Sequence, residues 1–427
     1  MNPAIILFLV FFITLALGVP FTWSMLLSVI SSVVLSGQNV SAQFFANKMY
    51  AGGAKYTLLA VFFFLLAGAI MQHGGISKRL INCAKAWVGH LDGGLSIVAI
   101  ICCMFFAALS GSSIATTCAI GGMLYPELVK EGYPKGYAAA LPIAGGTLGI
   151  VIPPSIAFVI FGSTMNVSVG ALLISGFVPG ILAGLAMCLY AYFVARKNHF
   201  PKSTKFSLKR ALIETKNAFW ALLMPVIILG GIYTGFFTPT ESAAVAVFYG
   251  LIVSTFIYRE MSFKKLVQIT IESVKSNANC LMLIMSALVF SWAMTVYKVP
   301  DMFMRFMLSV ISSKFTFLLA MNVLLLVLGM LMDTSAVILI VGPLLYPIAM
   351  QFGIDPVHMG CVMVFNLAVG QATPPFGSCL FAGTTVTDQK ILSLSKSVLP
   401  FVLIEFAVVL LISFVPGLVM GLVNAML

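Results

Sequence analysis

Long apolar runs separated by short polar segments dominate the hydrophobic pattern of this chain. Runs of about 17 to 25 mainly apolar residues are long enough, as helices, to cross the hydrocarbon core of a bilayer. The fold class that follows is an all-α polytopic membrane protein. The pattern predicts ten crossings, at residues 3–17, 21–35, 56–72, 137–164, 169–195, 219–236, 240–258, 278–296, 357–385 and 398–423.

Two further apolar stretches, 94–125 and 317–346, are too long for one crossing and are interrupted midway by polar residues. The interruptions begin at Ser110 and at Asp333, and each predicts a re-entrant hairpin with a polar tip. Polar irregular backbone at membrane depth is tolerated only where it is buried in protein or lines a cavity. The hairpin tips are therefore candidate binding elements, and the alternative is two ordinary helices joined by a surface loop.

Composition excludes a soluble globule. Of 427 residues, 61% are hydrophobic and 8% are charged, against roughly 25% charged in an ordinary soluble domain. With 12 acidic residues and 4 histidines, little material exists for acid–base chemistry, so we expect a transporter and not an enzyme. The eight cysteines include no CxxC pair, and neither a disulfide, a metal cluster nor a cofactor is indicated.

An internal repeat supports the membrane interpretation. A shift of 221 positions superimposes Leu124-Tyr125-Pro126 on Leu345-Tyr346-Pro347 and Pro153-Pro154 on Pro374-Pro375, without a gap between the two matches. The same shift aligns Ser112 with Asp333. The chain is therefore predicted to be a duplication. Each half has five crossings and one hairpin, and because five is odd, the two repeats enter the membrane from opposite sides. Such inverted repeats are typical of secondary transporters.

The basic residues predict the orientation. The net charge of +11 comes mainly from Lys and Arg in short segments between apolar runs, where they act as topology signals and not as a nucleic-acid surface. On the predicted topology, 18 of the 23 basic residues lie on one side, which the positive-inside rule makes cytoplasmic. Both termini are then periplasmic, the first hairpin opens inward, and the second opens outward.

Amphipathic stretches at 77–89, 262–276 and 300–313 predict horizontal helices that brace a fixed scaffold in the headgroup layer. The hairpins and interrupted spans then form a moving part, which indicates an elevator-type mechanism. The predicted organisation is as follows: scaffold helices and arm, 1–92; first transport elements, 93–168; last helix of repeat one and basic linker, 169–218; second scaffold helices and arm, 219–315; second transport elements, 316–388; and last helix, 389–427.

The span after each hairpin is interrupted by paired prolines, which follow glycines at Gly145 and at Gly370. Proline cannot continue the helical hydrogen-bond ladder, and glycine lets the backbone unwind. Unwound carbonyls with Ser and Thr hydroxyls suit Na⁺, and the N-termini of half-helices favour an anion. A proline kink that only shapes packing is the alternative.

Acidic residues inside the spans are costly in lipid and so carry information. Asp333, at the second tip, is either a Na⁺ ligand or a helix N-cap. Glu241 is predicted to cap the helix that begins near Pro239. Glu405 has no obvious partner and is either a proton or cation group or a structural contact. The histidines are expected at the membrane interface: His73, His90, His199 and His358.

At this point the motifs resemble a known family, the large membrane subunit of tripartite ATP-independent periplasmic (TRAP) transporters. The resemblance implies an ion-transporter-type elevator fold, Na⁺-driven uptake of a small organic anion, and an inner-membrane location. It also implies two partners, a four-helix small membrane subunit and a periplasmic binding protein. Sialic acid is the favoured substrate and a C4-dicarboxylate is next. The matching segments are SGSSIATTCAIGGMLYPEL from Ser110, AGGTLGIVIPPSI from Ala144, FTPTESAAV from Phe237, MDTSAVILIVGPLLYPIA from Met332 and NLAVGQATPPFGSCLF from Asn366.

The resemblance also implies site residues. The substrate is expected between the two tips, and the Na⁺ ions beside each tip. The implied Na⁺ residues are Ser110, Ser112, Ser113, Gly145, Asp333, Thr334, Gly370 and Thr373, and the implied substrate residues are Ser113, Ser155, Ser335, Pro374 and Ser378.

Other functions stay open at this point. A Na⁺/carboxylate symporter that needs no binding protein would share the hairpins and broken spans. A membrane-embedded transferase or a channel are less favoured alternatives. Because the chain starts directly at the first span, the small subunit is expected to be a separate protein.

Overall fold

The computed structural model describes residues 2–202 and 206–426, and these residues form helices without any strand. Lys205, part of the predicted basic linker, lies outside the described residues. The first half contains α1 (Pro3–Ala16), α2 (Phe21–Leu35), α3 (Ala42–Gly53), η1 (Tyr56–Leu58), α4 (Leu59–His73), α5 (Ile76–Val88), α6 (Gly94–Ser110), α7 (Ser113–Lys130), α8 (Lys135–Thr147), η2 (Leu148–Ile150), α9 (Ile156–Met165), α10 (Val169–Ser175) and α11 (Phe177–Lys197).

The second half is helical in the same manner. It contains α12 (Leu208–Tyr233), α13 (Pro239–Ile252), η3 (Val253–Ile257), α14 (Phe263–Val296), α15 (Val299–Val310), α16 (Lys314–Leu331), α17 (Thr334–Gln351), α18 (Pro356–Ala372), α19 (Ser378–Thr387), α20 (Ile391–Phe414) and α21 (Gly417–Met426).

The repeat inferred from the sequence recurs in the helix boundaries. Shifted by 221 residues, α7 (113–130) coincides with α17 (334–351), and the start of α8 at 135 coincides with the start of α18 at 356. Both hairpins are present, α6 with α7 and α16 with α17. Both broken spans are present too, α8 with α9 and α18 with α19, and each break contains a cis X–Pro bond.

The number of crossings is supported only in part. Within the described residues, eight helices are long and apolar enough to cross a membrane, and two of them, α16 and α17, are the arms of one hairpin. Other predicted crossings, such as α1, α2 and α18, fall among the shorter apolar helices. The all-helical membrane fold is confirmed, and the figure of ten crossings stays a prediction.

One local expectation is wrong, and one helix was not expected. The predicted horizontal helix at 262–276 and the crossing at 278–296 form one continuous helix, α14, because no Gly or Pro interrupts that sequence. The helix α3 was not predicted, because it is too short and too polar to resemble a crossing. His358, near the start of α18, is buried in the protein: it is 1% exposed, and its Nε2 lies 2.9 Å from the carbonyl oxygen of Ile412 on α20. Its location at the membrane interface stays a prediction.

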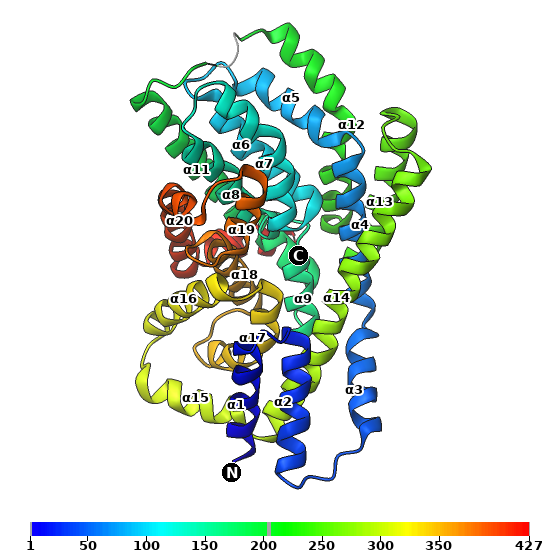
Figure 1. Ribbon diagram of the computed structural model, residues 1–427, viewed down its shortest axis with the longest axis vertical. Coiled ribbons are helices and arrows are strands. Elements are labelled where there is room, and N and C mark those ends of the chain that lie inside the picture. The colour runs from blue at the N-terminus through cyan, green and yellow to red at the C-terminus, as the bar shows by residue number, and fades with distance from the viewer. Residues whose placement is uncertain (1, 203–205, 427) are drawn as a thin grey trace.

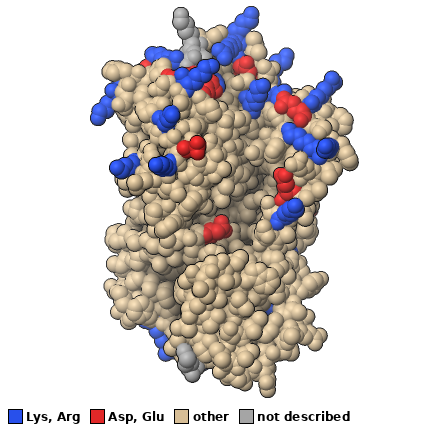
Figure 2. Space-filling view, viewed as in Figure 1, with Lys and Arg blue, Asp and Glu red and all other residues tan. Residues whose placement is uncertain are grey.

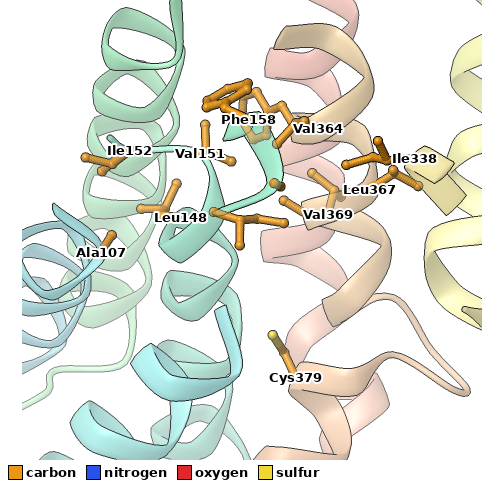
Figure 3. Packing of buried hydrophobic residues seen from close by; sticks show 14 of the residues in the cluster. Ala107, Leu148, Val151, Ile152, Phe158, Ile338, Val364, Leu367, Val369 and Cys379 are labelled. Carbon is orange, nitrogen blue, oxygen red and sulfur yellow. The ribbon is translucent and has the colours of Figure 1, made fainter. Parts of the chain in front are cut away.

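The hairpins pack against the broken spans to form one unit. We call α6–α9 together with α16–α19 the transport unit. Within it, α7 packs on α8 and α19, and α16 packs on α18. Figure 3 shows Leu148 and Val151 of the first break lying opposite Leu367 and Val369 of α18, all four fully buried. The apolar core therefore joins the two repeats at the level of the breaks.

The remaining helices of each half lie beside this unit. In Figure 1, α3, α4, α13 and α14 run along one side of the molecule, with α14 in contact with α2, α3 and α4. The helices α11 and α20 flank the transport unit, since α11 packs on α6 and α20 packs on α8 and α18. The division into a scaffold and a moving part stays a prediction.

The charged side chains are unevenly distributed along the long axis. On the face shown in Figure 2, Lys and Arg gather at the end where α5 and the α11–α12 connection lie in Figure 1. The opposite end, with the N-terminus, α3 and α15, shows few. This polarity agrees with the basic asymmetry used to predict the orientation, while the orientation itself stays a prediction.

Candidate functional site

The first hairpin tip is seated directly on the break between α8 and α9. Gly111 ends α6 in the left-handed conformation with a φ of 61°, where a side chain would be strained. A Cβ at this position would also lie 2.9 Å from the carbonyl oxygen of Pro154. The backbone N–H of Ile156 donates to the carbonyl of Gly111 at 3.5 Å. Glycine is therefore required for the tip to contact the break.

The hydroxyls of the first tip bind the protein itself. Ser112 caps α7, with its Oγ accepting from the N–H of Ala115 at 3.4 Å. Ser110 Oγ and Thr116 Oγ1 lie 3.0 Å apart. Ser113 Oγ donates to the carbonyl of Thr147 at the end of α8, over 3.2 Å. The serine hydroxyls of the first tip therefore already form hydrogen bonds within the protein.

Glycines on α8 and η2 allow this close approach. A Cβ on Gly149 would lie 2.5 Å from the carbonyl oxygen of Ser112, and one on Gly145 would lie 2.9 Å from Cys103 on α6. In the second repeat, a Cβ on Gly370 would lie 2.6 Å from the backbone of Gly329 on α16. Each break is therefore in backbone contact with its own hairpin.

The second tip differs from the first because it carries a charge. Asp333 caps α17, and its Oδ1 accepts from the N–H of Ser335 at 2.8 Å. The predicted N-cap role is thus confirmed, and the predicted Na⁺ role stays a prediction. Thr334 Oγ1 accepts from Nε2 of Gln371 on α18 at 2.9 Å. Asp333 itself is exposed and forms no ion pair within the described residues.

Both tips face one cavity of about 170 Å³. The tips contribute Ser112 and Ser113 of the first hairpin and Asp333, Thr334 and Ser335 of the second, and Gln371 of α18 also lines the cavity. The wall opposite the tips comes from outside the transport unit, and it contains Val61 and Leu65 of α4 together with Ser276 and Cys280 of α14. Residues 221 positions apart are thus brought together against a wall of other helices.

A second cavity, of about 510 Å³, adjoins the first at Asp333. It is lined by Ser378 and Thr385 of α19, by Phe376, and by Ile114 and Cys118 of α7. The Ser378 hydroxyl has no hydrogen-bond partner among the described residues. Asp333 therefore stands between the cavity at the tips and a wider one along α19.

The predicted site residues fall into two groups. Those that line a cavity are Ser112, Ser113, Asp333, Thr334, Ser335 and Ser378. Those that are not among the residues lining these two cavities are Ser110, Gly145, Ser155, Gly370, Thr373 and Pro374.

Ser155 is the predicted substrate residue least suited to contact a substrate. It is fully buried, it caps α9, and its hydroxyl donates to the carbonyl of Ile150 while accepting from the N–H of Phe158 at 3.3 Å. The hydroxyl of Thr373 is likewise used, donating to the carbonyl of Val369 at 2.8 Å.

Sequence reasoning missed several polar residues of the site. Gln371 aligns with Ile150 under the 221-residue shift, so the repeat gave no reason to single it out. Asn366 of α18 donates to the side chain of Asn322 on α16 at 2.7 Å, and Asn322 donates to Ser413 on α20 at 3.0 Å. Asn322, Asn366 and Ser413 each stand alone within an apolar run, and this isolation is the signal that could have indicated them.

The comparisons with known proteins decide the family. The family model described as the tripartite ATP-independent periplasmic transporter, DctM component, matches residues 8–418. The chain belongs to this family. It is therefore a transporter permease and not an enzyme, and membership implies a multi-pass location in the inner membrane.

Relatives of this DctM-family chain are named for different substrates. The C4-dicarboxylate TRAP transporter large permease protein DctM of Pseudomonas aeruginosa is 41% identical over 384 residues, or 90% of each chain. The isethionate TRAP transporter permease protein DctMQ of Oleidesulfovibrio alaskensis is 40% identical over 98% of this chain and 66% of the longer relative. The sialic acid TRAP transporter large permease protein SiaM of Vibrio cholerae is 35% identical over 93% of each.

Solved structures share the fold of this DctM-family chain at low sequence identity. The YdaH transporter of Alcanivorax borkumensis, described as having an unusual topology, aligns with a TM-score of 0.63 at 14% identity, over 88% of this chain and 90% of that one. MtrF of Neisseria gonorrhoeae aligns with a TM-score of 0.60 at 14% identity, over 87% and 82%. At this identity the likeness concerns the fold alone.

Proposed function

We propose that the chain carries out Na⁺-coupled uptake of a small organic anion by an elevator movement of the transport unit. The observation that carries this proposal is the cavity at which the two hairpin tips meet, because one wall belongs to the transport unit and the other to α4 and α14. A site built from inverted repeats and interrupted helices is the arrangement by which secondary transporters alternate access.

The chemistry of the tips supports a cation beside an anion. Asp333 supplies a carboxylate at the cavity, and the hydroxyls of Ser113 and Thr334 lie next to unwound backbone. Oxygen donors of this kind suit Na⁺, and the positive N-terminal ends of α7 and α17 favour a bound anion. No Lys or Arg is among the residues that line the two cavities. An anionic substrate would therefore be held by helix ends, hydroxyls and bound Na⁺.

The elevator movement is supported by the distribution of polar contacts around the cavity. The hydrogen bonds of the tips, such as Ser113 to Thr147 and Gln371 to Thr334, join parts of the transport unit to one another. The facing wall, by contrast, includes the apolar side chains of Val61 and Leu65. The same wall also contains Ser276 and Cys280, but the tip hydrogen bonds named above do not reach it. A unit tied together internally in this way can move without breaking its own binding site.

The substrate class is a small organic anion. The relatives named for a C4-dicarboxylate and for isethionate share 41% and 40% of aligned residues with this chain, and the relative named for sialic acid shares 35%. This order gives no support to the preference for sialic acid that the sequence motifs suggested. We therefore place a C4-dicarboxylate first and keep sialic acid as a candidate. The tripartite family also implies that a periplasmic binding protein delivers the substrate and that a small membrane subunit completes the permease.

Reconstituted uptake tests this function. The chain is placed in proteoliposomes with its small subunit, and uptake of labelled succinate, isethionate and sialic acid is measured with and without an inward Na⁺ gradient and the binding protein. We expect uptake of one of these anions that requires both. Uptake that is indifferent to Na⁺ would contradict the coupling, and uptake by the chain alone would favour a two-component Na⁺/carboxylate symporter.

A further inference from the structure

A buried carboxyl group lies behind the first hairpin, outside the cavities described above. Glu405 of α20 is 0% exposed, and its Oε1 lies within hydrogen-bond distance of Thr147 Oγ1, at the end of α8. Its other oxygen, Oε2, has no partner among the described residues. None of the ion pairs in the described part of the chain includes Glu405. An ionised carboxylate in this place would be a buried charge without a counter-charge, which is costly.

The Thr147 hydroxyl contacts two oxygen atoms that compete for its single proton. Thr147 Oγ1 is 2.6 Å from the carbonyl oxygen of Ala144 and also contacts Glu405 Oε1. A hydroxyl has one hydrogen to donate and two lone pairs to accept with. The one Thr147 proton can go to Glu405 Oε1 or to the carbonyl of Ala144, which can only accept. With that proton on the Ala144 carbonyl, both contacts are hydrogen bonds when Glu405 carries a proton of its own and donates it to Thr147 Oγ1.

We propose that Glu405 is held as a neutral carboxylic acid that donates to Thr147 and acts as a positioning residue for the first hairpin site. The same Thr147 offers its backbone carbonyl to Ser113 Oγ at 3.2 Å. Glu405 therefore fixes, through one residue, the break on which the first tip rests. The inference rests on the proposed function, because it assigns Glu405 to the support of a cation and substrate site at the tips.

The surroundings of Glu405 fit a neutral acid. α20 packs against α8, α11, α16, α18, α19 and α21. The thiol of Cys379 on α19 is a titratable neighbour of Glu405. No Lys, Arg or His within the described residues forms an ion pair with Glu405. A neutral acid leaves only a carbonyl-like Oε2 unpaired, which costs less than leaving a charged oxygen unpaired.

The variants Glu405→Gln and Glu405→Leu test the proposal together. A glutamine amide keeps the size and the donor to Thr147 but cannot ionise, so the Na⁺ concentration for half-maximal uptake should stay within about two-fold of wild type. Leucine removes the donor, and we expect that concentration to rise roughly ten-fold, the equivalent of one lost buried hydrogen bond. The exposed Glu272 on α14 provides the control Glu272→Gln, which should leave uptake unchanged.

Infrared spectroscopy gives a readout that does not depend on transport. At neutral pH the wild-type permease should show the C=O stretching band of a protonated carboxylic acid, and E405Q should lack it. If this band is absent from the wild type, or if E405Q is as impaired as E405L, Glu405 acts as an ionised group and the proposal is wrong. Unchanged Na⁺ activation in E405L would equally overturn it.

Variants of Thr147 keep the test decisive if E405L does not fold. Thr147→Val is nearly isosteric and lacks the hydroxyl, while Thr147→Ser keeps it. We expect T147V to reproduce the ten-fold rise and T147S to behave as wild type; equal behaviour of the two would count against the proposal. If wild-type uptake proves indifferent to Na⁺, the proposed function fails, whereas the infrared band still decides the state of Glu405.

Discussion

The two hairpin tips occupy equivalent positions in the repeat, yet they differ in charge and in hydrogen bonding. Ser112 and Asp333 align under the 221-residue shift, and both cap the helix that follows. The first tip is neutral, and its Ser113 hydroxyl donates to the backbone of the break. The second tip carries an exposed carboxylate, and its Thr334 accepts from Gln371, a side chain of the break.

This difference shows that the two copies of a duplicated element can keep the same fold while offering different chemical groups to one cavity. Capping requires only an oxygen in the right place, and Ser and Asp both provide one. The carboxylate adds a charge to the cavity that a serine cannot provide. We therefore expect the first tip to depend on geometry and the second on charge, and the following changes separate these two dependences.

The largest effect should come from Asp333. Asparagine caps a helix as well as aspartate does, so Asp333→Asn removes the charge and keeps the cap, whereas Asp333→Ala removes both. If Asp333 binds Na⁺, both variants should lower Na⁺-dependent uptake by roughly a hundred-fold or more, since even the loss of groups that only orient metal ligands costs about 10–100-fold. Initial uptake rates across a Na⁺ series in proteoliposomes provide the measurement. Near-normal uptake in D333N would leave Asp333 with the capping role alone.

The next effect concerns the backbone contacts that the two repeats share. Gly149→Ala would place a Cβ 2.5 Å from the carbonyl oxygen of Ser112, and Gly370→Ala would place one 2.6 Å from the backbone of Gly329. Because backbone cannot move aside as a flexible side chain can, each variant should lose about 1–3 kcal/mol of stability. The loss of stability in each variant is measured by thermal unfolding in detergent.

Gly122 on α7 is the matched control for these substitutions, because a Cβ there would meet nothing within 4 Å. Gly122→Ala should leave the melting temperature unchanged or raise it slightly, since alanine favours a helix over glycine. A G149A protein as stable as G122A would show that the first break does not need its close contact with the hairpin.

The positions of the two helix breaks could be predicted from the sequence, but the hydrogen-bond partners of the side chains around them could not. Paired prolines cannot continue a helix, so both breaks were predictable from Pro153 and Pro374. The contacts made by hydroxyls were not, because they depend on which side chains long-range packing brings together. Thr147 and Glu405 are 258 residues apart, and under the repeat Glu405 aligns with Gly184, so no internal match could indicate its role.

A smaller effect should separate the two ways in which the tips are tied to their breaks. Ser113→Ala removes a donor to a backbone carbonyl, and Gln371→Leu removes a donor to the Thr334 hydroxyl. The net contribution of one such buried hydrogen bond is about 0.5–1.5 kcal/mol. The Thr334 hydroxyl can rotate to another partner, but the carbonyl of Thr147 is fixed in the backbone. We expect about a ten-fold loss of uptake in S113A and a smaller loss in Q371L, as measured by initial rates. The reverse order would mean that Gln371 contributes to the site beyond its bond to Thr334.

The smallest effect should come from Ser112, and it makes the contrast with Asp333 most direct. Ser112→Ala removes the cap of α7, worth about 1 kcal/mol, and should lower uptake only roughly three- to five-fold without changing the Na⁺ dependence. Ser112→Asn restores a capping oxygen and should restore uptake, because the first tip needs the cap and not a charge. At position 333 the same residue should fail, because there the charge is needed. If S112A instead raises the Na⁺ concentration required for uptake and S112N does not correct it, the Ser112 hydroxyl binds the ion directly, and the two tips divide the Na⁺ chemistry between them more evenly than their charges indicate.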